Sequence, residues 1–172
     1  MVSFFFEKNM LDIKIKKITE LGITPTKNDG DAGYDLYSIE DYTLQPLERR
    51  LFKTNIALEI PTGYYGKICD RSGKALKNGL HVMAGTIDST YRGDIGIVLI
   101  NLSGLPLFLE YILSYLSKMF PNTASYFGEH VLIAKGDKIA QIVFRKYEDA
   151  TFVEEDLSET ERAEKGFGSS GN

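Results

Sequence analysis

The feature that most restricts the fold of this chain is a series of short, β-rich runs separated by turn residues. Residues with strand propensity fill the segments 11–15, 51–60, 64–69, 95–100, 131–134 and 139–144. Glycine, proline or aspartate marks turns at positions 61–63, 73, 79, 93 and 136–137. Runs of this length and spacing are typical of a β-sandwich or barrel. With 172 residues, the chain is expected to form one all-β domain, a barrel or jelly roll.

One segment departs from the strand pattern. Between residues 105 and 120, apolar side chains recur at helical spacing, with Pro106 suited to a first helical turn and Pro121 to a stop. The pattern predicts a helical insertion within about 103–128. Because its apolar residues surround the helix, it needs burial, either on its own subunit or against a protein partner or a membrane surface.

Charge and cysteine content exclude several classes of protein. The net charge is −4 with acidic and basic residues intermixed, which argues against binding nucleic acid or an anionic membrane. The single cysteine, Cys69, cannot form an internal disulfide, and no secretory signal pattern is present. The longest apolar stretch is interrupted by Glu110 and Lys118 and is too short to span a membrane. We expect a cytoplasmic or nuclear protein, or one of the host cytosol if the chain is viral.

Two segments carry grouped polar side chains, the first a pair of carboxylates and the second donors suited to binding phosphate. Asp31 and Asp35 stand four residues apart around a glycine, a pattern that alone also fits a turn capped by aspartates. Arg71, Ser72 and Gly73 join a planar guanidinium, a hydroxyl donor and a backbone that a ligand can approach closely. The same three residues also fit the start of a surface helix. These segments therefore indicate a phosphate site only in combination with the rest of the chain.

Three further segments supply a carboxylate, a strand start and a glycine-rich tail. Asp88 lies in an expected hairpin over 84–93. A carboxylate there can deprotonate water, an effect of about 10²–10⁴ in rate, although a single aspartate in a hairpin is more often a turn residue. Segment 136–141 opens an expected strand and ends in Gln141. Segment 162–171 has an arginine, a phenylalanine among glycines and two serines, which suit a flexible lid or a disordered terminus.

In this order and spacing, the five segments resemble the five motifs of the trimeric deoxyuridine triphosphatase (dUTPase) family, from about residue 11 to residue 171. The resemblance implies a jelly-roll β-barrel of the β-clip type and one domain over 1–172. It implies a homotrimer in which each active site draws motifs from all three subunits. It also implies hydrolysis of dUTP to dUMP and pyrophosphate with Mg²⁺ held by the triphosphate and water, and no protein side chain as a direct metal ligand.

The resemblance assigns the chemistry to the third motif. Asp88 matches the aspartate that activates the water attacking the α-phosphorus and that meets the sugar 3′-hydroxyl. Tyr91 matches the residue that packs on deoxyribose and excludes a 2′-hydroxyl. The hairpin backbone at Gly85, Thr86 and Ile87 would pair with the uracil edge. A rigid hairpin would leave mismatched groups of cytosine unpaired and would crowd out the 5-methyl group of thymine, so both bases would be rejected.

The other motifs supply the phosphate contacts and the lid that the resemblance implies. Asp35 would orient Arg71, which would bind the chain of phosphate oxygens together with Ser72, the Gly73 amide and Gln141. The tail at about 160–172 would close over the site. Its expected contacts are Arg162 on the γ-phosphate, Phe167 over uracil, and Gly168, Ser169 and Ser170 on the phosphates.

Two positions depart from the family pattern. Lys74 replaces a usually apolar residue of the second motif, and Ala163 replaces a usual glycine in the tail.

Two other functions stay open. The related dCTP deaminases use a catalytic glutamate, so Asp88 and the phenylalanine of the tail argue against deamination. The second alternative is a dUTP-sensing module that binds a protein partner through the insertion.

Overall fold

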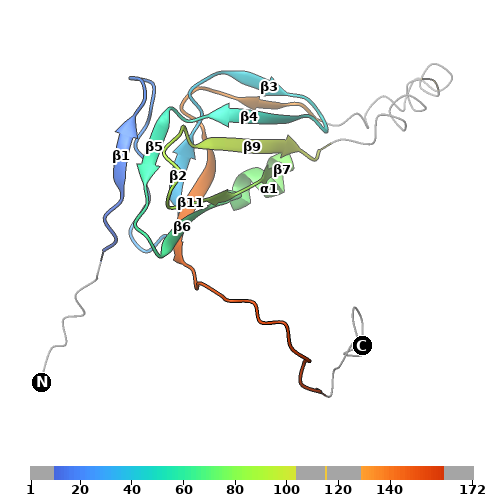
Figure 1. The fold of residues 1–172 in the computed structure, drawn as a ribbon. Helices are drawn as coiled ribbons and strands as arrows, with labels where there is room; N and C mark the ends of the chain where they lie inside the picture. The colour runs from blue at the N-terminus through green and yellow to red at the C-terminus, as the bar shows by residue number, and fades with distance from the viewer. Residues whose placement is uncertain (1–9, 104–114, 116–128, 161–172) are drawn as a thin grey trace, which may run out of the picture.

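The computed structural model describes residues 10–103, 115 and 129–160. Figure 1 draws the other residues as a thin grey trace. The expected helical insertion, apart from Tyr115, lies outside the described residues. The tail residues expected to form the lid, Arg162, Phe167, Gly168, Ser169 and Ser170, also lie outside them.

The described residues form a predominantly β structure, as the sequence predicts (Figure 1). A four-stranded sheet has the order β2 (Tyr34–Tyr37), β11 (Lys138–Lys146), β6 (Tyr64–Cys69), β8 (Thr86–Ile87). A three-stranded sheet has the order β4 (Arg49–Lys53), β9 (Gly96–Asn101), β7 (Leu80–Met83). Two strand pairs complete the fold: β1 (Lys14–Lys17) with β5 (Ile56–Glu59), and β3 (Tyr42–Leu44) with β10 (Val131–Ile133). All of these pairings are antiparallel.

A single apolar core lies between the sheets. Alternate residues of the strands point inward, as in β9, where Ile97 and Leu99 are buried and the residues between them are only half-buried. Phe52 on β4 and Ile142 on β11 are fully buried in the same cluster. The core therefore fixes the register of each strand, because a shift of one residue would turn its apolar side chains to solvent.

The predicted strand over 51–60 is wrong in its extent. The structure divides this segment into β4 and β5, and Asn55 between them has a φ of 54°. This left-handed conformation breaks a strand, and asparagine tolerates it better than most residues. The buried Thr54 hydroxyl donates to the Ile95 carbonyl at 2.7 Å and holds the corner in place.

The short helix α1 (Ser72–Asn78) follows β6 directly. Arg71 is its N-cap in an extended conformation, and Gly79 ends it with a φ of 62° and an N–H donating to the Ala75 carbonyl at 3.1 Å. A Cβ at position 79 would lie 2.9 Å from the backbone nitrogen of Ser103. Gly79 therefore determines where α1 ends and how closely it approaches the end of β9.

Replacing Gly79 with alanine should destabilise the protein. The left-handed backbone alone is expected to lower the free energy of unfolding by about 1–2 kcal/mol, and the contact with Ser103 adds to this. Urea denaturation measures the change. Leu76→Ala, on the same helix at a side chain that is 88% exposed, is the control and should shift stability by less than about 0.5 kcal/mol. Equal midpoints for the two variants would contradict the assignment.

Candidate functional site

The first, second and fourth motif segments meet around one cleft of about 650 Å³. Strand β11 lies between β2 and β6, and its Gln141 pairs with Asp35 on one side and Cys69 on the other. The Gln141 amide donates to the Asp70 carbonyl at 2.8 Å, and a side chain at Gly33 would overlap with it. The sheet register therefore brings together three segments that are far apart in the sequence.

Arg71 is held from two directions inside this cleft. Its Nε lies 2.9 Å from Oδ1 of Asp35, whose side chain is only 14% exposed. Its Nη1 donates to the backbone carbonyl of Lys138 at 3.3 Å. The Lys138 ammonium lies 2.7 Å from the other Asp35 oxygen, and this hydrogen bond raises the pKa of Lys138. One carboxylate thus carries two cationic partners.

The cleft is locally basic although the whole chain has a net charge of −4. Five basic side chains and two carboxylates line it. The basic residues are Arg71, Lys74, Lys77, Lys138 and Arg145, and the acidic ones are Asp31 and Asp35. Such a lining attracts anions locally without giving the protein a basic surface overall. The Ser72 hydroxyl and the Gly73 backbone lie on the same wall, and the structure places no side-chain atoms within 4 Å of a Cβ built at Gly73.

Lys74, a departure from the family pattern, has a defined partner. Its ammonium lies 3.1 Å from Oδ2 of Asp137, and the Lys74 side chain is 24% exposed. The pair links helix α1 to the turn that precedes β11. An ion pair therefore fixes the Lys74 side chain at this position.

Asp88 lies beside a second cleft of about 530 Å³, lined by Tyr65, Thr86, Asp88, Ser89, Thr90 and Tyr147. Strand β8, which precedes Asp88, pairs with β6 at Gly66 and Lys67. The Gly85 carbonyl accepts the Ile68 N–H at 2.7 Å, and a Cβ at Gly85 would overlap with the Ile68 carbonyl. This close approach explains the glycine and makes the hairpin rigid.

Tyr91 closes the turn that carries Asp88. Its N–H donates to the Asp88 carbonyl at 3.1 Å, and its hydroxyl donates to the Asp94 carbonyl at 3.0 Å. Tyr91 is 45% exposed, so part of this residue remains accessible to a ligand or to another chain.

The two clefts lie at opposite ends of β6 and share no lining residue. Ile87, next to Asp88, pairs with Gly66, and Arg71 follows five residues later, or roughly 16 Å of extended chain. The Arg71 side chain then reaches toward Asp35 on β2, the edge strand opposite β8. Within one chain, Asp88 and Arg71 therefore lie at separate clefts.

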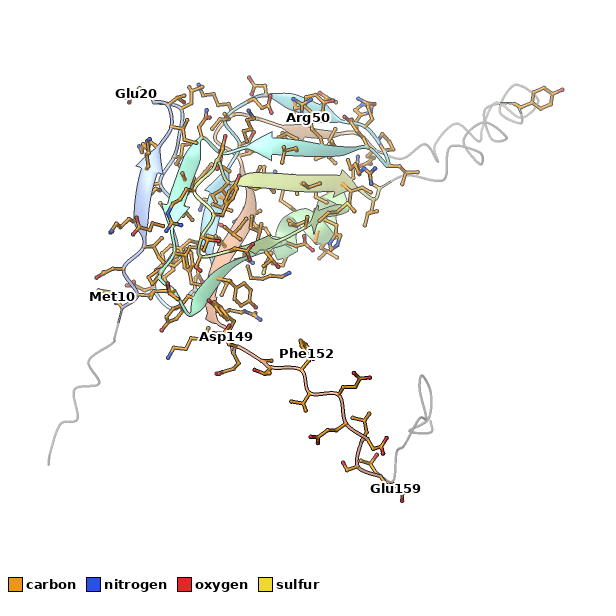
Figure 2. The ribbon with its side chains drawn as sticks, viewed as in Figure 1. Met10, Glu20, Arg50, Asp149, Phe152 and Glu159 are labelled. Atoms are coloured by element: carbon orange, nitrogen blue, oxygen red, sulfur yellow. The ribbon has the colours of Figure 1, made fainter. Side chains whose placement is uncertain are left out.

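Residues 149–160 extend away from the body of the molecule (Figures 1 and 2). The side chains of Phe152 and Leu157 are 97% and 94% exposed, and Figure 2 shows Phe152 and Glu159 along this extended arm. Exposed apolar groups in such an arm gain stability when another surface covers them.

The described residues contain neither a metal-binding cluster nor a membrane-spanning helix. No group of three or more His, Cys, Asp or Glu side chains there could hold a metal ion. No helix there is long and apolar enough to cross a membrane.

The regions of this chain that match known proteins contain the same motif segments. The sequence profile of the dUTPase family matches residues 19–111 and 124–171. The chain belongs to the dUTPase family. Its curated relatives include the dUTPase of Fowlpox virus, 38% identical over 94% of this chain and 99% of the relative. The dUTPases of Clostridium novyi and Mus musculus are 37% and 36% identical, over 94% and 92% of this chain and 99% and 85% of those proteins.

Solved dUTPase structures share the fold. The dUTPase of Staphylococcus bacteriophage 80alpha, determined with dUpNHpp, is 33% identical with a TM-score of 0.69, over 94% of this chain and 99% of that chain. A mutant dUTPase of phage phi11 is 27% identical with a TM-score of 0.68, over 87% of this chain and 99% of that chain, and is described as coordinating a structural Mg(II) ion. The predicted family and the jelly-roll β-clip fold are confirmed.

Sequence reasoning missed several residues of this dUTPase-family chain that line the clefts. Lys138 contacts Asp35 and Arg71, and Tyr65 and Tyr147 form walls beside Asp88. Tyr65 lies in β6 and Tyr147 follows directly after β11. The alternation of side chains along these strands could have indicated which face of the sheet each tyrosine occupies. Lys138 carries no such signal, because a β-bulge reverses the alternation of its strand.

Proposed function

We propose that this chain hydrolyses dUTP to dUMP and pyrophosphate with Mg²⁺. The observation that carries the proposal is the meeting of three motif segments of a dUTPase-family chain around one basic cleft, with Arg71 held by Asp35 at 2.9 Å. A basic, hydrogen-bonding cleft of this kind suits a triphosphate. The rigid hairpin with the exposed Asp88 supplies the carboxylate that hydrolysis needs.

The reaction can be divided between the two clefts. Arg71, Ser72, the Gly73 amide and Gln141 bind the phosphate chain and stabilise charge that develops on it and on the leaving pyrophosphate. Asp88 accepts a proton from the water that attacks the α-phosphorus. The hairpin backbone near Gly85 recognises uracil, Tyr91 packs on deoxyribose, and the tail with Arg162 and Phe167 closes over the substrate.

The distance between the clefts supports a site shared between subunits of a homotrimer. Asp88 of one copy would face Arg71 of another, because one chain holds the two at opposite ends of β6. A suitable contact surface lies on the outer face of the three-stranded sheet, where Leu51 and Met83 both pair with Val98. Leu51 is 53% exposed there, and a second copy would bury this apolar row.

The residues around the basic cleft fit Mg²⁺ that arrives with the substrate. The described residues offer no cluster of three or more ligating side chains, and the Asp35 carboxylate already pairs with the side chains of Arg71 and Lys138. A triphosphate would provide the oxygen ligands that Mg²⁺ prefers in proteins. An ion that arrives with the substrate would supply neutralisation of the phosphate charge, while Arg71, Ser72 and Gln141 would hold the phosphate chain.

Pyrophosphate release from dUTP, dTTP, dCTP and UTP by the full chain with Mg²⁺ tests the proposal, with light scattering to determine the oligomeric mass. We expect a trimer that hydrolyses dUTP at least about a hundredfold faster than the other nucleotides. Ammonia release from dCTP would replace the proposal with deamination. Binding of dUTP without turnover would replace it with a nucleotide sensor.

A further inference from the structure

Lys138 contacts both members of the Asp35–Arg71 pair. Its ammonium lies 2.7 Å from Oδ2 of Asp35, while Oδ1 of the same carboxylate lies 2.9 Å from Nε of Arg71. Its carbonyl accepts a hydrogen bond from Nη1 of Arg71 at 3.3 Å. The three residues therefore form a closed ring of contacts at the wall of the basic cleft.

A β-bulge gives Lys138 this position. The register of β11 against β2 shifts between Lys138 and Ala140, and Ile139 and Ala140 are both buried. With strict alternation, Lys138 and Gln141 would lie on opposite faces of the sheet. The extra residue reverses the alternation, so Lys138 faces Asp35 on the same side as Gln141.

The turn before the bulge is anchored on two sides. Ser38, at the end of β2, donates its N–H to the Asp137 carbonyl at 2.9 Å, and its own carbonyl accepts the Gly136 N–H at 2.8 Å. The Asp137 side chain pairs with Lys74 of helix α1 at 3.1 Å. The backbone of Lys138 therefore starts from a fixed point relative to both β2 and α1.

The ring of contacts has a direct consequence for Arg71. A guanidinium is planar, so fixing it at Nε and at Nη1 determines its plane and the direction in which it can donate to a phosphate. The Lys138 ammonium also engages the second Asp35 oxygen, which limits rotation of the carboxylate. Misplacing a group that binds the reacting part of a substrate by about 1 Å can cost about a hundredfold in rate.

We propose that Lys138 is a positioning residue: through Asp35 and its own carbonyl, it holds the guanidinium of Arg71 in the orientation that receives the triphosphate. The inference rests on the proposed function and deepens it. Lys138 acts through Arg71, so its side chain makes no necessary contact with substrate. The competing role, in which the Lys138 ammonium binds phosphate directly, makes a different prediction for a double variant.

The test compares Lys138→Met and Lys138→Arg with Lys135→Met, a matched control. Lys135 is an exposed lysine in the same turn, and its side chain makes none of the ion pairs of the described residues. We expect Lys138→Met to lower kcat/KM for dUTP by about 10- to 100-fold. Lys138→Arg should recover most of this loss, and Lys135→Met should match the wild type. Melting temperatures and Lys138→Gln, a second neutral variant, separate a folding defect from a positioning defect.

A double-mutant cycle with Asp35→Asn separates positioning from direct phosphate binding. If Lys138 acts through Asp35, adding Lys138→Met to Asp35→Asn should lower kcat/KM by less than about twofold. An undiminished loss in that background would overturn positioning in favour of direct binding. Equal activity of Lys138→Met and the wild type would overturn any role for this side chain.

Binding of inorganic triphosphate, followed by calorimetry in the same variants, makes the result independent of turnover. Positioning is supported if Lys138→Met weakens triphosphate binding, if Lys138→Arg restores it, and if Lys138→Met has no further effect in the Asp35→Asn background. This result supports positioning even in a chain without dUTP hydrolysis. Such a chain would contradict the proposed function alone. Wild-type hydrolysis together with unchanged triphosphate binding and unchanged kcat/KM in Lys138→Met would contradict the positioning role alone.

Discussion

Asp88→Asn should lower the turnover of dUTP by about a hundredfold or more, because the amide keeps the shape of the side chain and cannot accept the proton of the attacking water. Asp88 is exposed and lies in a hairpin that is fixed by the Gly85 contact with Ile68, so the substitution should leave the fold intact. The measurement is single-turnover hydrolysis of dUTP with saturating Mg²⁺.

Binding of a non-hydrolysable dUTP analogue is the control for Asp88→Asn. A dissociation constant within about threefold of the wild type would assign the loss to chemistry rather than to substrate binding. Near-normal turnover in this variant would move the general base to another residue.

Mixed trimers of Asp88→Asn and Arg71→Ala chains should regain activity that neither variant has alone. In a shared site, Asp88 comes from one copy and Arg71 from another. Random mixing in equal amounts therefore leaves about a quarter of the sites with both wild-type residues. If one chain supplied both residues, every site would lack one of them and mixing would recover nothing.

The two variants are refolded together and separately, and dUTP turnover per trimer is compared at equal concentrations. The control mixes each variant with itself through the same procedure. Recovery to about a quarter of wild-type turnover supports the shared site. No recovery, in a sample that light scattering shows to be mixed trimer, would contradict it.

The strand pattern of the sequence predicts most of the fold because burial of alternate residues leaves a period of two. The runs at 95–100 and 139–144 correspond to β9 and β11, whose inward residues form the core. The single run at 51–60 contains a corner at Asn55, because strand-forming residues lie on both sides of the polar residues 53–55 and the left-handed φ of 54° at Asn55 breaks the strand there. Composition reports burial, whereas chain direction depends on backbone geometry at single residues.

The candidate site, like the fold, could be predicted only in part from the sequence. The five ordered motifs identify the family by their resemblance to it, and Arg71, Asp35 and Gln141 meet in the structure around one cleft. The motif order does not reveal that Asp88 lies at the far end of β6 from Arg71. That separation depends on the pairing of β8 with β6 and of β11 with β2, which are contacts between distant segments.

The sequence by itself determined the family and the all-β class, and it predicts the residues with the chemistry for a nucleoside triphosphate, because these depend on residue type and local order. Only the tertiary structure decided that Lys138 reaches Asp35, that Lys74 pairs with Asp137, and that Asp88 and Arg71 stand apart. The physical reason is that a bulge, a turn and a sheet register are set by the packing of the whole core. One extra residue in β11 is enough to turn a lysine from one face of the sheet to the other.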